Sequence, residues 1–115
     1  MYLSEKNKKN VRNVFYVPHT GRGIEIVGVN SYVKTESDEE GHVINVLYLY
    51  NRPIAKTNGI NVWFRTCGLF NYDTFRWLDA IGAPSTEKEL KAYKAYSEYV
   101  LYNKSVKEIL KGYAL

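Results

Sequence analysis

The feature that most constrains the fold is the order of two kinds of pattern along the chain. The first 85 residues contain runs of β-branched and aromatic residues separated by glycine, proline and asparagine turns, whereas the last 30 carry helix-start signals. Strands that precede helices, instead of alternating with them, favour an α+β fold. We therefore expect an antiparallel sheet or partial β-barrel over about residues 12–67, followed by a short helix and a C-terminal helical pair.

Four strands are expected in the first part of the chain. They cover residues 12–17, 24–34, 43–50 and 60–66, with turns at 18–23, 35–41 and 51–59. Gly28 lies inside the long second strand, where a glycine often marks a bulge or bend that lets a strand curve into a barrel. The short connections between successive strands predict an antiparallel meander.

Helix-start signals follow in the last third of the chain. Four side chains are suitable N-caps: Asn71, Asp73, Thr86 and Ser105. One of the first two would begin a short helix over residues 74–81, and the last two each open a capping box. We expect helix over residues 86–111 with an interruption near 103–105. Tyrosines recur every three residues in its first part and would drift around the helix, because three falls short of the helical period.

The size of the chain indicates one domain in a reducing compartment. The 115 residues are typical of a single domain, in which residues 1–10 form a basic tail that need not be ordered. No apolar run approaches the roughly 20 residues that span a bilayer, and no signal-peptide pattern opens the chain. A single cysteine cannot form an internal disulfide. We expect a cytoplasmic protein without a membrane partner, located in the host cytoplasm if a phage encodes it.

The distribution of charge is more informative than its total. The net charge is +4, and residues 36–40 contain four of the twelve acidic residues. The rest of the chain therefore has a net charge of +8, four more than the whole. A surface with that excess of cations attracts polyanions, and it also favours solubility.

Candidate catalytic side chains are sparse. Cys67 would need a neighbouring histidine to become an activated nucleophile, and His19 and His42 both lie near predicted turns. Two histidines and one cysteine also lack the closely spaced pairs that hold zinc. The sequence therefore predicts no enzymatic activity, no cofactor and no metal site.

Aromatic residues lie beside basic or amide residues in several segments. Four segments combine them: Tyr32-Val33-Lys34, Tyr48-Leu49-Tyr50-Asn51-Arg52, Trp63-Phe64-Arg65 and Phe75-Arg76-Trp77. Proteins that bind single-stranded nucleic acid use this combination, because bases stack on aromatic faces while cations contact the phosphates. The combination favours a nucleic-acid-binding function.

The predicted strand at residues 60–66 shows the pattern most clearly. Alternation places Ile60, Val62, Phe64 and Thr66 on one face, and Asn61, Trp63, Arg65 and Cys67 on the other. The first set suits a core, and the second set exposes Trp63 between an amide and a guanidinium. Alternatively, Trp63 packs under the C-terminal helix while Arg65 reaches solvent. In the first interpretation, four further residues extend the binding path: Lys34, Tyr48, Tyr50 and Arg52.

A long strand at residues 23–34, a strand at 43–50, an aromatic strand at 61–66 and an amphipathic segment ending at 77–82 follow one another. This order resembles small bacteriophage single-stranded-DNA-binding and recombination-mediator proteins with an OB-type barrel. The resemblance implies an OB-like barrel, a phage or mobile-element origin, and nucleic-acid binding on a strand face. The chain ends in Lys111-Gly112-Tyr113-Ala114-Leu115 and lacks the acidic tail of such proteins, so partner recruitment through a tail is not implied.

Two functional hypotheses result. The first is a non-enzymatic protein that binds single-stranded nucleic acid through Trp63 and Arg65. The second is a small protein-binding inhibitor or adaptor, phage-encoded and acting on a host nucleic-acid enzyme such as a CRISPR or restriction effector. Its working surface would consist of an acidic loop and helical tyrosines: Glu36, Asp38, Glu39, Glu40, Tyr99 and Tyr102. The helical tyrosines would also permit a homodimer through the C-terminal helices.

Overall fold

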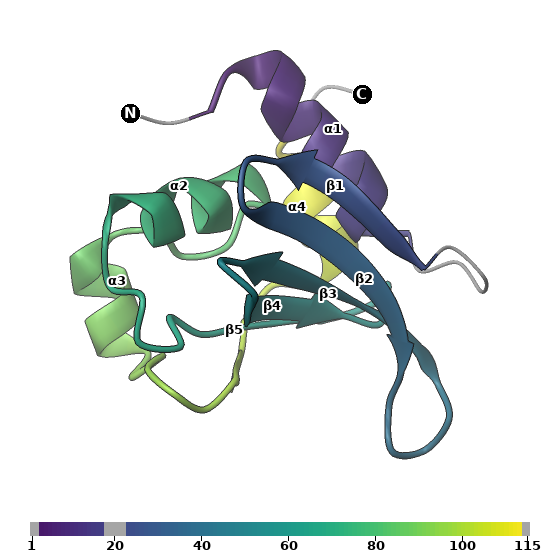
Figure 1. Ribbon diagram of the computed structural model, residues 1–115. Helices are drawn as coiled ribbons and strands as arrows, with labels where there is room; N and C mark the ends of the chain where they lie inside the picture. Colours follow the sequence, from purple (N-terminus) through teal and green to yellow (C-terminus); the bar gives the residue numbers. More distant parts are fainter. Residues whose placement is uncertain (1–2, 18–22, 114–115) are drawn as a thin grey trace.

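One open antiparallel sheet forms the centre of the protein, and each strand pairs with its neighbour in sequence, in the order β1-β2-β3-β4-β5-β6. The computed structural model describes residues 3–17 and 23–113 of the chain (Figure 1). The strands are β1 (Ile24–Gly28), β2 (Ser31–Ser37), β3 (Val43–Leu49), β4 (Arg52–Thr57), β5 (Val62–Phe64) and β6 (Val100–Leu101). The predicted antiparallel meander is confirmed, as an open sheet and not a closed barrel.

In the described part of the chain, four helices complete the α+β fold. They are α1 (Glu5–Phe15), α2 (Tyr72–Ala80), α3 (Glu87–Ala92) and α4 (Val106–Lys111). Each begins at a polar N-cap that accepts a hydrogen bond from a backbone N–H of the first turn: Ser4, Asn71, Thr86 and Ser105. The last three of these caps confirm the sequence prediction, and Ser105 forms a complete capping box with Glu108. Within the described residues, none of the helices combines the length and apolarity needed to cross a membrane.

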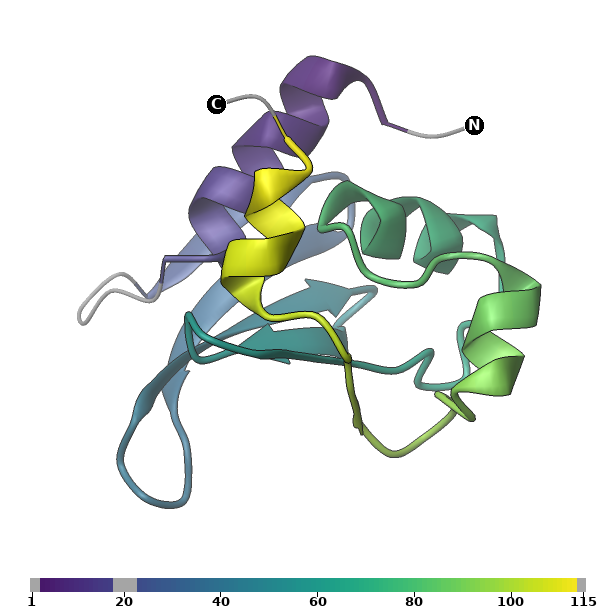
Figure 2. The ribbon, with the colours of Figure 1, turned by 180° about the vertical axis from the view of Figure 1, so that it is seen from behind.

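The core lies between the sheet and helices α1, α2 and α4, which cover the same side of it (Figure 2). We call this side of the sheet the inner face. One row of paired residues on it is fully buried: Val33, Leu47, Ala55 and Phe64. Phe15 of α1 and Leu78 of α2 pack into the same core and are also 0% exposed. Because side chains alternate along a strand, the residues between them form an outer face on the opposite side.

A buried amide joins helix α1 to the sheet. Asn45 of β3 is fully buried, and its Nδ2 donates to the carbonyl oxygens of Val14 at 3.2 Å and Phe15 at 2.8 Å. Its Oδ1 accepts a hydrogen bond from Thr35 Oγ1 at 2.8 Å. The last carbonyl groups of a helix have no partner within it, and Asn45 donates to two of them.

The strand expected at residues 12–17 is wrong, because residues 12–15 are the end of helix α1. The predicted tail is also wrong in part, since the helix begins at Glu5. Val11, Val14 and Phe15 are spaced three and four residues apart, which places them on one helical face against the sheet. Packing therefore overrides the strand preference of these residues. Most of the predicted turn at 18–23 lies outside the described residues.

The long strand expected at residues 24–34 is two strands, β1 and β2, joined by a turn. Asn30 in this turn has a φ of 59°, a left-handed conformation that asparagine tolerates well. The pairing register shifts between Ile26 and Gly28, so the glycine does mark an irregularity. It also permits a close approach, because a Cβ at Gly28 would lie 2.5 Å from the ring of Trp77.

The loop expected at residues 51–59 contains strand β4. Pro53 discouraged a strand there, but it lies where the pairing register with β3 shifts, next to Tyr48. A proline is tolerated at such an irregularity. The strand expected at residues 60–66 is correspondingly shorter, since β5 covers only Val62–Phe64.

The helix expected from residue 86 to the interruption near 103–105 stops at Ala92. Lys94 has a φ of 56°, and the chain then extends and pairs with β5 as strand β6. The Thr66 N–H donates to the Ala95 carbonyl at 3.0 Å, so this segment satisfies backbone groups beside the sheet. Tyrosines that recur every three residues form no continuous apolar face on a helix. The segment therefore pairs with the sheet instead of continuing the helix. Helix α4 then begins at its predicted capping box.

Candidate nucleic-acid interface

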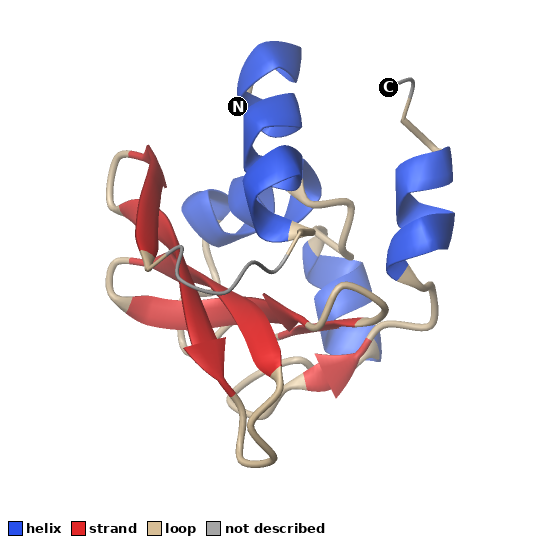
Figure 3. Ribbon diagram, turned by 90° about the vertical axis from the view of Figure 1, so that its right-hand side faces the viewer, coloured by secondary structure: helices blue, strands red, loops and turns tan. Residues whose placement is uncertain are grey.

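The outer face of the sheet brings aromatic and basic side chains together, and none of the described helices packs on it (Figure 3). One row of paired residues crosses four strands: Lys34, Val46, Lys56 and Trp63. The next row contains Tyr32 and Tyr48. Four of the six residues predicted to bind nucleic acid share this face: Lys34, Tyr48, Trp63 and Arg65.

The centre of the outer face is a group that we call the aromatic–basic cluster, consisting of Lys56, Trp63, Arg65 and Tyr99. Lys56 Nζ lies 5.5 Å from the ring centroid of Trp63 and 4.6 Å from that of Tyr99. The guanidinium carbon of Arg65 lies 4.1 Å from the ring centroid of Tyr99. These distances are within the range of cation–π interactions, so two cations flank one ring.

Backbone hydrogen bonds hold Arg65 in this position. Its Nε donates to the Pro53 carbonyl at 2.9 Å, and its Nη1 donates to the Ser97 carbonyl at 2.9 Å. Burial raises the pKa of the neighbouring Tyr99 phenol to about 12, although Arg65 acts in the opposite direction. The phenol is therefore neutral at physiological pH. Arg65 remains only half-buried, so a cation is presented in a fixed orientation at the surface.

Two tyrosines extend the aromatic surface away from the cluster. The rings of Tyr32 and Tyr48 are stacked, with centroids 4.9 Å apart and an interplanar angle of 12°. The Tyr48 hydroxyl donates to Glu36 Oε1 at 3.1 Å, and the Tyr32 hydroxyl donates to Asn51 Oδ1 at 3.2 Å. These hydrogen bonds fix the pair while leaving both residues half-buried.

The charge of the outer face is uneven. Glu36 lies 3.5 Å from Lys34 Nζ and so partly neutralises it. The acidic turn beyond Glu36, between β2 and β3, projects from the body of the protein (Figure 1). Asp38 in this turn accepts hydrogen bonds from the backbone N–H groups of His42 and Glu40, which lower its pKa. Positive charge is therefore concentrated at Lys56 and Arg65, away from the turn.

Tyr50 and Arg52, two residues predicted for the binding path, lie apart from the aromatic–basic cluster. Tyr50 is in the turn between β3 and β4 with a φ of 51°, and its hydroxyl donates to Asp73 Oδ2 of α2 at 2.8 Å. Arg52 Nη1 donates to the Cys67 carbonyl at 3.4 Å. Both lie at the turn between the central strands β3 and β4, at the ends of these strands.

Sequence reasoning missed two residues of the outer face. Lys56 falls in the segment 51–59 that is expected to be a loop, because Pro53 argues against a strand there. Tyr32 stands beside Lys34 in the sequence, but its stacking on Tyr48 depends on the register between β2 and β3. Trp63 itself lies on the face opposite the helices, and not under the C-terminal helix as the alternative interpretation required.

The residues of the protein-binding hypothesis do not form one surface. Tyr99 belongs to the outer face, whereas Tyr102 contacts the rings of Phe64 and Tyr93 in the core, with centroids 5.9 Å and 6.1 Å away. Burial raises the pKa of Tyr102, as expected for a phenol in the core. Neither tyrosine is on a helix. Only the acidic residues from Glu36 to Glu40 remain a continuous feature.

The described residues contain no group of three histidine, cysteine or carboxylate side chains that could hold a metal ion. His19 lies outside the described residues. Cys67 is a free, half-buried cysteine with a φ of 51°, and its backbone N–H donates to the Tyr96 carbonyl at 2.8 Å. Its place in the fold follows from the backbone hydrogen bonds between residues 66–67 and residues 95–96 beside β5.

Comparison of the chain with known protein families, with curated proteins and with solved structures finds no match in any of the three.

Proposed function

We propose that this protein binds single-stranded nucleic acid on the outer face of its sheet. The observation that carries this proposal is the aromatic–basic cluster, in which Lys56 and Arg65 flank Tyr99 beside Trp63 on a face without a helix. Bases would stack on Trp63 and on the Tyr32–Tyr48 pair. Lys56 and Arg65 would contact phosphates, and Lys34 would contribute despite its ion pair.

The physical basis is the combination of stacking and charge. Every base has a flat π-face, so aromatic side chains bind single strands with little sequence preference, at about 1–3 kcal/mol per stacked base. Lysine and arginine displace the counterions of the phosphates, which makes the affinity depend on salt. The net charge of +4 favours the approach of a polyanion. The acidic turn beyond Glu36 repels phosphates and so confines the strand to the rest of the face.

The test is a titration of the protein with single-stranded oligonucleotides at several salt concentrations. We expect the affinity to fall steeply as salt rises, and the Trp63 fluorescence to be quenched as a base stacks on the indole. Trp63→Ala should weaken binding by about 1–3 kcal/mol. Arg65→Ala should reduce the salt slope by about one phosphate contact.

Two exposed positions provide matched controls. Tyr72 of α2 is 75% exposed and Lys107 of α4 is exposed, and neither belongs to the outer face. Tyr72→Ala and Lys107→Ala should leave both affinity and salt slope unchanged. Circular dichroism checks that each variant is folded. A folded Trp63→Ala protein that binds oligonucleotides as tightly as the wild type would reject the proposal.

A further inference from the structure

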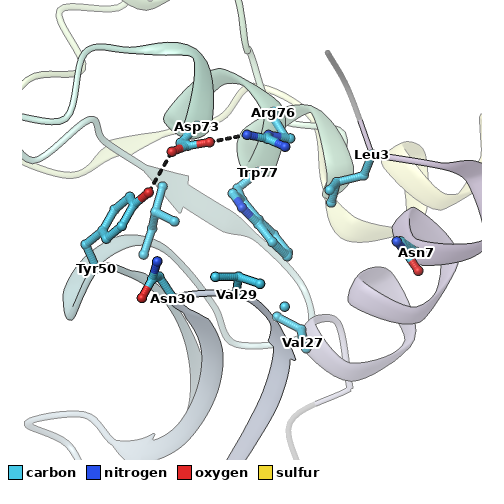
Figure 4. A pocket seen from close by; sticks show the side chains of 11 residues that line it. Leu3, Asn7, Val27, Val29, Asn30, Tyr50, Asp73, Arg76 and Trp77 are labelled. Carbon is cyan, nitrogen blue, oxygen red and sulfur yellow. Dashed lines mark hydrogen bonds and ion pairs between the residues drawn. The ribbon is translucent and has the colours of Figure 1, made fainter.

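Two clefts meet at the edge of the sheet beside the outer face. The deep cleft has a volume of about 440 Å³ and lies between α2, the β1–β2 turn and the start of α1 (Figure 4). The residues that matter for its chemistry are Val27, Val29, Tyr50, Asp73, Arg76 and Trp77. The shallow cleft has a volume of about 200 Å³, and Asn30 and Tyr50 line both clefts. The deep cleft is within the range of roughly 300–1,000 Å³ that is typical of small-ligand sites.

The deep cleft has an apolar side and a polar end. Figure 4 shows the indole of Trp77 between the Asp73–Arg76 pair and the two valines, Val27 and Val29. Val29 is 84% exposed, so the apolar side is open at the turn. An apolar slot with polar groups at one end suits a flat ligand that has hydrogen-bonding atoms on its edge.

The polar end is already arranged by contacts within the protein. Arg76 Nη2 pairs with one carboxylate oxygen of Asp73, and the other oxygen accepts a hydrogen bond from the Tyr50 hydroxyl at 2.8 Å. The hydrogen bond from Tyr50, and then that from Arg76, holds the pKa of Asp73 below its usual value. Among the described residues, the buried Nε of Arg76 has no hydrogen-bond partner. The Arg76 side chain as a whole is 35% exposed, so an acceptor in the cleft reaches the exposed part of the guanidinium and not this buried nitrogen.

The clefts are continuous with the outer face. Tyr32 lines the shallow cleft and stacks on Tyr48, which belongs to the outer face. Tyr50 then forms the wall between the shallow and the deep cleft. From Trp63 on β5 to Tyr32 on β2 the distance across the sheet is three strand spacings, roughly 14 Å. A single strand that passes from Trp63 over Tyr48 to Tyr32 reaches the clefts without crossing the acidic turn.

We propose that the deep cleft receives one nucleobase of the strand that the outer face binds, a proposal that rests on the proposed function. Trp77 is only 6% exposed, so a base packs its flat face against Val29 and against the part of the indole that lines the cleft. It also has edge acceptors for the guanidinium of Arg76, and it carries no charge that would oppose Asp73. The single strand turns over the ends of β2 and β3 at Tyr32 and Tyr50, so Tyr50 acts at the strand ends and not on the outer face.

The two tryptophans of the chain report separately on the two regions, since Trp63 is on the outer face and Trp77 in the deep cleft. The experiment follows their indole N–H resonances in ¹⁵N-labelled protein. The probes are thymidine, deoxyribose 5-phosphate and a thymidylate oligonucleotide of about 12 nucleotides. Thymidine should shift the Trp77 resonance saturably, the base-free sugar phosphate should not, and the oligonucleotide should shift both resonances.

Variants separate the deep cleft from the outer face. Arg76→Gln and Tyr50→Ala should each abolish the thymidine shift of Trp77 and weaken the oligonucleotide about tenfold. Tyr50 is 45% exposed, so its truncation is compatible with folding. Trp63→Phe should keep the thymidine shift of Trp77, and Tyr72→Ala on the same helix as Arg76 should change nothing.

The outcomes distinguish the two proposals. An oligonucleotide that shifts Trp63 while Trp77 responds neither to it nor to thymidine overturns the cleft proposal and leaves the proposed function intact. An oligonucleotide that shifts neither resonance overturns both. A Trp77 shift with deoxyribose 5-phosphate equal to that with thymidine shows a phosphate site and also overturns base recognition.

Discussion

The two faces of the sheet are built from the same strands, yet they differ in almost every physical property. On the inner face, the row from Val33 to Phe64 is apolar and 0% exposed. On the outer face, the adjacent row from Lys34 to Trp63 contains two lysines, and one of them, Lys56, lies over the half-buried ring of Trp63. Strand alternation therefore gives one protein a set of residues for stability and a neighbouring set that is free to bind a ligand.

Two residues illustrate the exceptions to this division. Asn45 is a fully buried amide on the inner face, where it donates hydrogen bonds to two carbonyl groups of α1. Val46 is 4% exposed on the outer face, although no described helix covers it. Its paired neighbours are Lys34 and Lys56, whose aliphatic stems can cover an apolar side chain. The outer face is thus a packed surface with charged tips.

The largest expected effect separates Phe64 from its neighbour Trp63. Phe64→Ala should lower the free energy of unfolding by about 3–5 kcal/mol, because it opens a cavity in the core. Trp63→Ala should cost only about 1 kcal/mol, the range of strand propensity at a half-buried site. Denaturant unfolding measures both. Equal losses for the two variants would remove the distinction between the faces.

A smaller effect is expected at Asn45. Asn45→Ala should lower the free energy of unfolding by about 1–3 kcal/mol, because the buried carbonyl groups of Val14 and Phe15 lose a donor. Oligonucleotide affinity should stay unchanged, since the residue lies on the inner face. Denaturant unfolding and an oligonucleotide titration of the same variant test the two statements. A weaker affinity in the folded variant would mean that the faces are coupled.

The smallest effect concerns pH. Burial raises the pKa of both Tyr48 and Tyr99 from 10.0 to about 12. Below pH 10 these phenols are protonated in both states, and their contribution to stability is fully present. Between about pH 10 and 12 the unfolded state loses the protons first, so the free energy of unfolding falls as pH rises.

Unfolding at several alkaline pH values measures this decline. Tyr48→Phe should remove part of it, because a phenylalanine has no proton to lose. Tyr72→Phe, at an exposed tyrosine, is the matched control for the substitution itself. An alkaline loss in Tyr48→Phe equal to that of the wild type would show that the outer-face phenols do not resist ionisation.

Local signals predicted well where the interaction that they describe is local. The N-caps Asn71, Thr86 and Ser105 act on backbone groups three residues away, and each begins a helix in the structure. The alternation around Phe64 and Trp63 likewise assigned these neighbours to opposite faces. Neither signal needs a distant segment of the chain.

The failures occurred where a distant segment decides the conformation. Residues 12–15 have strand-forming side chains but pack on the sheet as helix, and residues 100–101 lie in a stretch expected to be helix but pair with β5. The cleft between Tyr50 and Trp77 is a further case, because its walls come from segments that only the fold brings together.

The sequence by itself determined the α+β class, the antiparallel meander and the residues on the two faces around β5. These follow from periodicity, turn chemistry and capping, which act over a few residues. The tertiary structure decided the helical state of residues 5–15, the pairing of β6 and the stacking of Tyr32 on Tyr48. It also decided that Tyr50 forms a hydrogen bond with Asp73, which in turn pairs with Arg76. Each of these depends on long-range packing or on strand register. Some of the segments favour a different local conformation, and the other contacts form only when distant segments meet.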